Sequence, residues 1–578
     1  MNLSRREFLQ ILAAASAAGI GLNGCDSKKG AGSSTTADPY NIPAFGQVSF
    51  LHMTDCHAQL LPVYFREPNI NIGIGGATGK APHLVGEHLL KAFNIPADTR
   101  DAHAFTYLDF EEASRKYGKV GGFAHLSTLV KQLKASRPNS LLLDGGDTWQ
   151  GSATALWTKG QDMVDACKLL GVDIMTGHWE FTYGAERVQE IIKDMEGKIE
   201  FLAQNVVDNT FEDPIFKPYS MREMNGVQVA IIGQAFPYTP IANPRHMIPD
   251  WSFGIRDDRM QEMVDEVRGK GAQIVVVLSH NGMDVDLKMA TRVNGIDAIL
   301  GGHTHDGVPA PSIIKSPDGG KTLVINSGSN GKYLSLLDFE VKDGKVTDYR
   351  FKLLPIFSNL IEPDKEMQAY IDKARSPFKK DLEESLAITE SLLYRRGNFN
   401  GSFDQLILNA MMEVQDADMA LSPGFRWGTS LLPGDTITRE RLMDQTAITY
   451  ATSTLNEIKG DMLKIILEDI ADNLFHEDPY YQMGGDMVRI GGLKYSLDPM
   501  APMGKRIGDM ELNGKPLDAN KTYKVAGWAS MEKQPEGNPK IWDTVSEYLL
   551  DKKTVRIDEI NIPKIKGMES NPGYVRLG

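Results

Sequence analysis

Four short blocks of the chain place aspartate or histidine directly after an apolar run. The blocks are Thr54–His57, Gly145–Asp147, Leu278–Asn281 and Gly301–His305. Carboxylate oxygens and imidazole nitrogens are suitable ligands for divalent transition metals. One such block alone is an ordinary strand end, but four together predict a single dinuclear metal site. Its candidate ligands are Asp55, His57, Asp147, His280, His303 and His305.

The apolar runs before these blocks predict the strands that position the ligands. They are Val48–Met53, Leu141–Leu143, Ile274–Leu278 and Ile296–Leu300. In an open α/β sheet, chemistry collects outside the carboxyl ends of the strands. Asp-x-His and His-x-His suit such ends, because residues i and i+2 point to the same side. We therefore expect the four blocks to meet in space.

Helical spacing alternates with these strands and predicts an α/β layered domain over residues 46–358. The helical runs are Gly122–Ala135, Met163–Leu170, Ala185–Met195 and Asp257–Arg268. Glu362–Glu384 is charged, contains Pro377, and predicts a bridging helix within a linker over residues 359–385.

Residues 386–578 predict a second, α+β domain. Helices are expected near Phe403–Val414 and Met462–Asn473, and strands near Val488–Tyr495 and Thr522–Ala526.

The N-terminus predicts export. Ser4-Arg5-Arg6-Glu7-Phe8-Leu9 is a twin-arginine motif, and the apolar run Ile11–Leu22 after it is too short to span a membrane. Residues 1–24 are therefore expected to be a signal peptide of a periplasmic protein. Leu22-Asn23-Gly24-Cys25 resembles a lipoprotein cleavage box, with residues 25–45 as a flexible tether to a membrane. The alternative is a soluble periplasmic protein cut near Ala17-Ala18-Gly19.

The overall charge limits the class of partner. A net charge of −14 argues against nucleic acid as the main partner. It does not argue against an anionic substrate, because two divalent ions would dominate the local field.

The ligand blocks resemble the metallophosphoesterase domain of the 5′-nucleotidase family, and the second domain resembles that family's C-terminal domain. The resemblance implies a four-layer αββα domain followed by a substrate-binding α+β domain. It also implies one metal on Asp55, His57, Asp147 and His305, and a second on Asp147, His280 and His303.

One family block is altered in this chain. The family's Gly-Asn-His-Glu-Phe-Asp reads Gly177-His178-Trp179-Glu180-Phe181-Thr182 here. His178 replaces an asparagine ligand and can itself bind the second metal. Trp179 replaces the catalytic histidine and Thr182 its aspartate partner, so the family's auxiliary dyad is missing. We expect Trp179 to line the pocket.

The family's nucleoside site is also altered, whereas its anion site is retained. Thr449 and Ser530 fall where the family has two base-stacking phenylalanines. Arg426, in Ser422-Pro-Gly-Phe-Arg426, matches the arginine of the family's Asn-x-Gly-x-Arg motif. Arg426, Trp179 and His178 are therefore the candidate catalytic residues.

These changes, with the opening Thr54-Asp55-Cys56-His57-Ala58-Gln59, closely resemble the SoxB thiosulfohydrolases. That resemblance implies hydrolysis of the terminal sulfonate from a Cys-linked thiosulfonate on the carrier SoxYZ, with two manganese ions. Two alternatives are a periplasmic 5′-nucleotidase or phosphodiesterase, and a non-catalytic, metal-bearing lipoprotein that docks the carrier. Nitrogen and carboxylate ligands also suit zinc, iron or cobalt.

The glycine-rich segment Asn69–Lys80 allows two interpretations. It is either a mobile surface loop or a channel wall that admits an extended carrier peptide.

Overall fold

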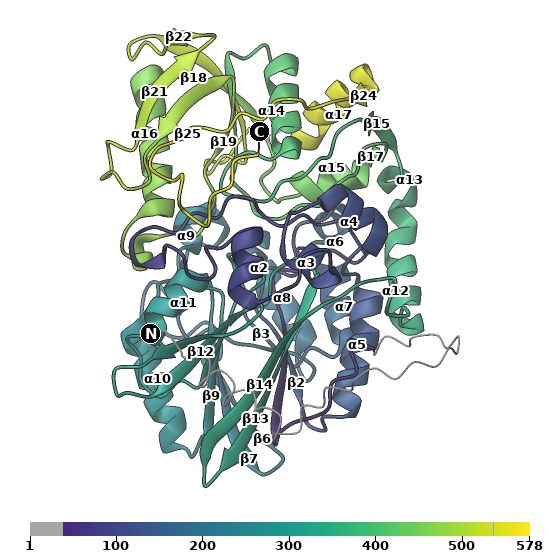
Figure 1. The fold of residues 1–578 in the computed structure, drawn as a ribbon, viewed down its shortest axis with the longest axis vertical. Helices are drawn as coiled ribbons and strands as arrows, with labels where there is room; N and C mark the ends of the chain where they lie inside the picture. The colour runs from purple at the N-terminus through teal and green to yellow at the C-terminus, as the bar shows by residue number, and fades with distance from the viewer. Residues whose placement is uncertain (1–37, 536, 578) are drawn as a thin grey trace, which may run out of the picture. The chain divides into compact units, whose positions relative to one another are not determined.

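Two six-stranded sheets form the N-terminal half of the computed structural model, which describes residues 38–535 and 537–577 (Figure 1). The first sheet has the order β14-β13-β1-β2-β3-β4. Its strands are β1 Val48–Met53, β2 Leu141–Asp144, β3 Ile174–Met175, β4 Glu200–Phe201, β13 Tyr333–Lys342 and β14 Lys345–Pro355.

The second sheet has the order β11-β12-β10-β9-β7-β6. Its strands are β6 Tyr219–Met224, β7 Val227–Gln234, β9 Ile274–Ser279, β10 Ala298–Gly301, β11 Ser312–Lys315 and β12 Lys321–Asn326. All four predicted ligand-bearing strands are present, and β10 begins two residues later than expected. A separate pair joins β5 Val207–Asp208 to β8 Trp251–Ser252.

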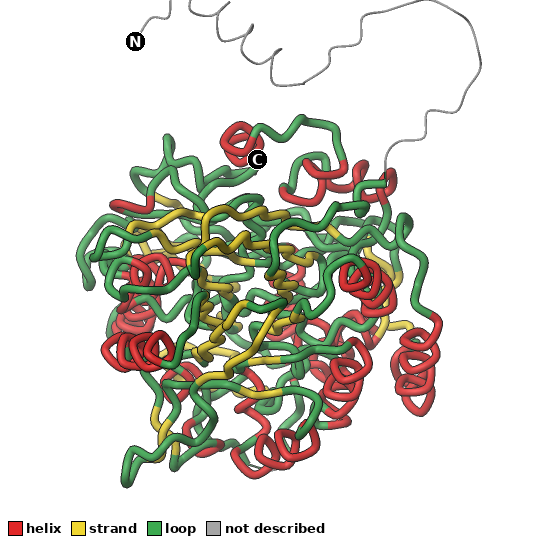
Figure 2. The backbone as a smooth tube through the Cα atoms, turned by 90° about the horizontal axis from the view of Figure 1, so that it is seen from below, coloured by secondary structure: helices red, strands yellow, loops and turns green. Residues whose placement is uncertain are grey.

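Alternate residues of the central strands enter different apolar cores. In β9, Ile274, Val276 and Leu278 face the core between the two sheets. Val275 and Val277 face the other way, onto helices α10 and α11. Because successive strand residues point to opposite faces, a fully apolar strand packs against two layers. The predicted αββα arrangement is thereby confirmed, and Figure 2 shows strands in the interior with helices on either side.

Each of the four predicted helices of this half begins and ends within two residues of its expected bounds. They are α5 Phe123–Ala135, α7 Gln161–Leu170, α8 Ala185–Met195 and α10 Asp257–Gly269. The other helices here are α2 Glu87–Phe93, α3 Arg100–Phe105, α4 Phe110–Tyr117, α6 Ala153–Thr158, α9 Thr239–Ala242 and α11 Met283–Ala290. Short 3-10 turns are η1 Gly75–Ala77, η2 Trp179–Tyr183 and η3 Arg245–Met247.

The expected single bridging helix is interrupted. α12 covers Lys365–Arg375, the 3-10 turn η4 covers Ser376–Phe378, and α13 covers Lys379–Leu382. Pro377 has no backbone N–H and its ring clashes with the preceding helical turn, so the α-helix ends just before it. The prediction of one continuous helix over Glu362–Glu384 was wrong for this reason.

The C-terminal half is α+β, as expected. Its sheets have the orders β18-β23-β16-β19, β22-β21-β20-β25 and β17-β15-β24. Their strands are β15 Ser385–Thr389, β16 Met419–Ser422, β17 Thr436–Thr438, β18 Ser453–Lys459, β19 Arg489–Gly491, β20 Leu493–Leu497, β21 Ile507–Leu512, β22 Lys515–Pro516, β23 Thr522–Trp528, β24 Thr554–Val555 and β25 Lys564–Ile565. The helices are α14 Ser402–Val414, α15 Arg439–Thr446, α16 Gly460–Phe475 and α17 Ile541–Lys552, with the 3-10 turn η5 Pro479–Tyr481.

Segments of the first half contribute to the C-terminal cores. Trp179 belongs to the core that contains Phe403 and Ile407 of α14. Ile70 and Ile72 belong to the core on the opposite face of the β18-β23-β16-β19 sheet, beside α16. The N-terminal part of Asn69–Lys80 is therefore buried, and only its glycine-rich end is exposed.

The expected export signal, Cys25 and most of the tether lie outside the described residues. Among the residues that are described, none of the helices has the length and apolarity needed to cross a membrane. Residues 43 onward form one compact unit and residues 38–42 belong to another.

Candidate metal centre and active-site cavity

Four loops at the carboxyl ends of strands bring the predicted ligands together. β1 and β2 are parallel neighbours in one sheet, and β9 and β10 are parallel neighbours in the other. Asp55 and His57 follow β1, Asp147 follows β2, His280 follows β9, and His303 and His305 follow β10. Five of these six residues have φ between 44° and 73°; the exception is His280. Left-handed backbone is costly for non-glycine residues and gathers at functional sites, so this clustering indicates a built site.

Two glycines lie where the loops approach so closely that no side chain would fit. A Cβ on Gly145 would lie 2.4 Å from Thr54 Oγ1, and one on Gly302 would lie 2.3 Å from the same oxygen. Thr54 therefore sits where the loops from both sheets meet. Its hydroxyl donates to Asp55 Oδ2 over 2.6 Å, which orients that carboxylate.

The side chains form two groups of four that share Asp147. In each group, one candidate ligand atom per residue lies within 4.8 Å of the others. One group is Asp55, His57, Asp147 and His305, and the other is Asp147, His178, His280 and His303. The structure thus brings together all seven residues, His178 included, in the two sets that the family resemblance implies.

The donor atoms fit a pair of divalent cations. His57 Nε2 and His305 Nε2 face each other at 3.0 Å, and two neutral imidazole nitrogens at that distance can share only one proton. His280 Nε2 is buried 3.1 Å from Asp147 Oδ2, and His178 Nδ1 is 3.4 Å from the same oxygen. Neither nitrogen has a hydrogen-bond partner among the described residues. The two groups therefore fit a dinuclear divalent metal centre.

Outer contacts fix the orientation of several rings. Gln150 O lies 3.2 Å from His57 Nδ1, and Gly145 O lies 2.6 Å from His280 Nδ1. Met483 O lies 3.1 Å from His303 Nε2, and Asn243 Oδ1 lies 3.3 Å from His178 Nε2. Metal-binding histidines usually donate their second ring N–H in this way, which selects the tautomer. The free nitrogen of each ring is then the one that faces the shared carboxylate or its neighbours.

The carboxylates of the site favour the protonated form of His280. Burial lowers the pKa of His280, but the carboxylates of Asp147 and Asp55 outweigh this and raise it to about 10. Burial lowers the pKa of His57 to about 4, so that ring is neutral at pH 7. Metal ligands must be deprotonated. We therefore expect metal binding near neutral pH to release the His280 proton.

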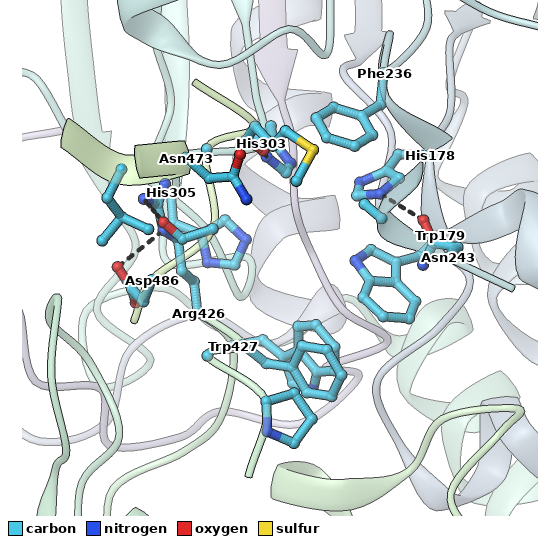
Figure 3. A pocket seen from close by; sticks show the side chains of 18 of the residues that line it. His178, Trp179, Phe236, Asn243, His303, His305, Arg426, Trp427, Asn473 and Asp486 are labelled. Carbon is cyan, nitrogen blue, oxygen red and sulfur yellow. Dashed lines mark hydrogen bonds and ion pairs between the residues drawn. The ribbon is translucent and has the colours of Figure 1, made fainter. Parts of the chain in front are cut away.

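A cavity of about 290 Å³ opens onto these ligands (Figure 3). Trp179, Phe236, Phe425 and Trp427 line it, and we call these four residues the aromatic wall. The Trp179 ring contacts Phe425 and Trp427 edge-to-face, at centroid distances of 5.1 and 5.0 Å. In Figure 3, Phe236, His178 and Trp179 lie on one side and Asn473, His305, Arg426 and Asp486 on the other. An apolar face thus stands opposite a polar, cationic one.

Arg426 lines the cavity from the C-terminal half. Its Nη2 donates to Gly485 O over 3.0 Å, and its Nε is 3.3 Å from Asp486 Oδ1. These contacts hold the guanidinium at the cavity edge with its other N–H groups available. A planar guanidinium in this place can bind a tetrahedral oxyanion with two hydrogen bonds.

Sequence reasoning missed Glu180, which organises the altered family block. Its buried carboxylate accepts four backbone N–H bonds, from His178, Asp147, Thr148 and Trp149, at 2.7 to 3.3 Å. The loops that carry Asp147 and His178 are thereby tied to one side chain. A charged residue between two aromatic ones, Trp179 and Phe181, was the available signal.

Trp179 lines the cavity as expected, but the other three residues of the aromatic wall were missed, and they change the interpretation of the nucleoside site. Thr449 and Ser530 are not among the described residues that line the cavity. Ser530 instead bonds within its own loop, and Thr449 is followed by Tyr450, whose ring stacks on Trp179 at 5.9 Å. The cavity is thus rich in aromatic rings, and two of them, Phe425 and Trp427, flank Arg426 in the sequence.

Known proteins support this geometry. The sequence family of the 5′-nucleotidase C-terminal domain matches this chain over residues 389–539. A solved structure of the Thermus thermophilus sulfate thiohydrolase SoxB, in complex with glycerol, is 36% identical and superposes with a TM-score of 0.87. The match covers 91% of this chain and 98% of that one. The chain belongs to the SoxB family. This family lies within the wider 5′-nucleotidase family, as the resemblance predicted.

More distant relatives of this SoxB-family chain include 5′-nucleotidases. The Rattus norvegicus 5′-nucleotidase is 27% identical over 454 residues, which is 70% of this chain and 76% of that protein. Protein UshA of Yersinia enterocolitica is 24% identical over 495 residues, or 74% and 84% of the two chains. The 5′-nucleotidase precursor structure from Thermus thermophilus shares the fold, with a TM-score of 0.70 at 22% identity and coverage of 90% and 99%. The family and the two ligand groups both indicate a dinuclear metal-dependent hydrolase.

Proposed function

We propose that this protein is a thiosulfohydrolase that removes the terminal sulfonate from a Cys-S-thiosulfonate, or S-sulfonate, on the SoxYZ carrier and releases sulfate. One observation carries the proposal. Trp179 stands in the cavity wall beside His178, at the position where the nucleotidase block has its catalytic histidine. The likeness to the SoxB structure supports the same substrate class.

The proposal assigns roles to the residues that surround the cavity. Asp55, His57, Asp147 and His305 would hold one ion, and Asp147, His178, His280 and His303 the other. Two bound ions supply water activation and neutralise charge on a tetrahedral oxyanion. Arg426 binds the sulfonate oxygens. The aromatic wall excludes bulk water and contacts the sulfur chain, because sulfur packs favourably against aromatic rings.

The leaving group explains why the dyad is dispensable. A nucleoside leaves as a poor alkoxide, whereas the carrier leaves as a sulfur anion, and even a simple thiol has a pKa of about 8.5. A persulfide anion therefore needs no acid to leave near neutral pH. Trp179 and Thr182, which cannot carry out proton chemistry, fit that requirement.

We further propose that both ions are Mn²⁺. Imidazole nitrogen with carboxylate oxygen suits Mn²⁺, and also Zn²⁺, Fe²⁺ or Co²⁺. Elemental analysis of the protein purified without chelator distinguishes these. Zinc at two equivalents per chain would contradict the manganese assignment.

The proposed location is the periplasm, reached by twin-arginine export, with an optional lipid anchor at Cys25. The corresponding domain order is signal 1–24, tether 25–45, metal domain 46–358, linker 359–385 and C-terminal domain 386–578. Mass spectrometry of the mature N-terminus tests this proposal. An unmodified N-terminus downstream of residue 25 excludes the anchor.

The deciding experiment measures sulfate release from a Cys-S-thiosulfonate peptide beside phosphate release from AMP. The metal-loaded protein is expected to release sulfate and to hydrolyse AMP at least roughly tenfold more slowly, since Trp179 and Thr182 replace the dyad that would assist an alkoxide leaving group. Faster AMP hydrolysis would favour the 5′-nucleotidase alternative. Inactivity on both substrates with both metals bound would favour a docking lipoprotein.

A further inference from the structure

A small polar cavity adjoins the main cavity, and none of the four residues of the aromatic wall lines it. It has a volume of about 40 Å³ and shares Arg426, Asn473, Gly484 and Gly485 with the main cavity. We call it the annex. Its lining also includes Thr304, which lies between His303 and His305 in the chain, and Asn281, which follows His280. The annex is therefore one residue removed from three candidate ligands.

The annex contains a paired histidine and aspartate that the proposed function leaves unused. His83 Nε2 lies 3.0 Å from Asp284 Oδ2, and His83 Nδ1 lies 3.3 Å from Asn71 O. Both ring nitrogens thus face oxygen acceptors, an arrangement that only the doubly protonated ring satisfies completely. Losing one proton costs one hydrogen bond and leaves the ring in place, so His83 can alternate between the two forms.

The surrounding charges hold the proton affinity of His83 above the ordinary range. Burial lowers the pKa of His83, but the carboxylates of Asp284 and Asp306 outweigh it and raise the pKa. Arg426 faces Asp284, and Arg396 faces Asp306, which moderates both carboxylates. His83 is the histidine of this group, and imidazole is the side chain best suited to exchanging protons near neutral pH.

The proposed reaction requires both water and a proton acceptor. Water oxygen bonds to the sulfonate sulfur, and the sulfur–sulfur bond breaks with its electron pair on the carrier sulfur. The sum is R–S–SO₃⁻ + H₂O → R–S⁻ + SO₄²⁻ + 2 H⁺, where R–S is the carrier persulfide and no oxidant is consumed. A carrier arm that fills the main cavity blocks the direct route to solvent. A cavity needs about 10–15 Å³ to hold one water, which the annex exceeds.

We propose that the annex supplies water to the metal cavity and removes protons from it, with His83 and Asp284 as the relay pair. This inference rests on the proposed function. His83 is not a catalytic residue, because it acts on the reacting atoms only through water.

The test compares His83→Gln with a matched variant, His88→Gln, whose histidine is exposed on α2. Sulfate release from the thiosulfonate peptide is followed from pH 5 to 10 with the metal-loaded, full-length protein. His83→Gln should lower kcat roughly tenfold, below the 10²–10⁴-fold typical of direct proton transfer, and leave KM unchanged. Added imidazole should restore part of the rate, which a purely structural role of His83 would not allow. His88→Gln should match the unmodified protein.

Asp284→Asn provides the second variant. Removing the carboxylate lowers the proton affinity of His83, so the limb of the pH–kcat profile that reports His83 should move to lower pH. If both variants fold, bind two metals and follow the unmodified protein at every pH, the relay is wrong and the thiosulfohydrolase proposal stands. If the unmodified protein releases no sulfate but hydrolyses a phosphate ester, the thiosulfohydrolase proposal fails. The same variants on that ester then decide the relay.

Discussion

The metal-ligand side of the cavity and its aromatic wall are held by different forces. The ligands sit on strained, left-handed turns at strand ends, tied by hydrogen bonds to backbone carbonyls and to Glu180. The aromatic wall is held by ring packing, and Trp179 and Trp427 belong to the main apolar core of the C-terminal half. The first side provides a reaction shared by many esters of tetrahedral acids. Under the proposed function, the second selects among their leaving groups, and reactivity and selectivity could then be changed separately.

The strongest challenge to the ligand side is Asp147→Asn. Asparagine tolerates the left-handed backbone at this position, so the fold should persist, but its neutral amide cannot bridge two cations. We expect elemental analysis to show both ions depleted and sulfate release to fall by roughly a hundredfold or more, since metal ions contribute several kcal/mol. The exposed Asp416→Asn is the control. Full metal occupancy in Asp147→Asn would refute the bridging role.

Glu180→Gln tests whether the scaffold beneath the ligands matters as much as the ligands. In the native protein, the backbone N–H groups share the Glu180 carboxylate. Glutamine has the same size, but its NH₂ group would face some of these donors and could not accept from them. Metal affinity should drop by about ten- to a hundredfold, the usual effect of removing outer-shell support. Titration with Mn²⁺ by calorimetry measures this, with the exposed Glu383→Gln as control. Affinity equal to that of the control would limit Glu180 to folding.

Arg426→Lys probes the polar side of the cavity, opposite Phe236 and Trp179. Lysine keeps the charge but loses the two-point geometry, so kcat/KM on the carrier substrate should decrease at least roughly tenfold, or about 1.4 kcal/mol. The exposed Arg556→Lys should have no effect. An unchanged kcat/KM for Arg426→Lys would place the sulfonate elsewhere.

The double variant Trp179→His with Thr182→Asp restores the nucleotidase dyad and should have the smallest effect on the sulfur substrate. If leaving-group quality makes the dyad dispensable, phosphate-ester hydrolysis should rise while sulfate release changes little. Rates on both substrates, measured on one preparation, provide the comparison. A large gain in sulfate release would show that the dyad was never dispensable for this reaction.

The ligand side was predictable because its information is local. Asp55 and His57, or His303 and His305, are two residues apart at the end of an apolar run, and parallel strands must bring such ends together. The strands and helices followed from periodicity, except at Pro377, where the missing N–H broke the expected helix. Positions 449 and 530 were matched to the family's stacking residues only by counting from motifs, and neither lines the cavity.

The aromatic wall could not be predicted in the same way. Phe236 follows β7 of the second sheet, whereas Phe425 and Trp427 follow β16 of the C-terminal half. These three rings come together only when the two halves pack, and no spacing pattern in the sequence records that packing. Glu180 was missed for a different reason, since a buried carboxylate satisfied by four backbone N–H groups looks like any surface glutamate until the loops are folded around it.

The position of Trp179 within an apolar core has an evolutionary consequence. Its ring lines the cavity on one side and packs with residues of the α14 core on the other. A buried aromatic side chain contributes about 1.5–3 kcal/mol, a large part of the margin of an ordinary domain. Replacements that broaden the accepted leaving groups should therefore first appear as a lower melting temperature and a smaller yield of folded protein. Changes at this residue therefore alter both the substrate range and the stability of the fold. A new specificity would persist only after a stabilising substitution elsewhere.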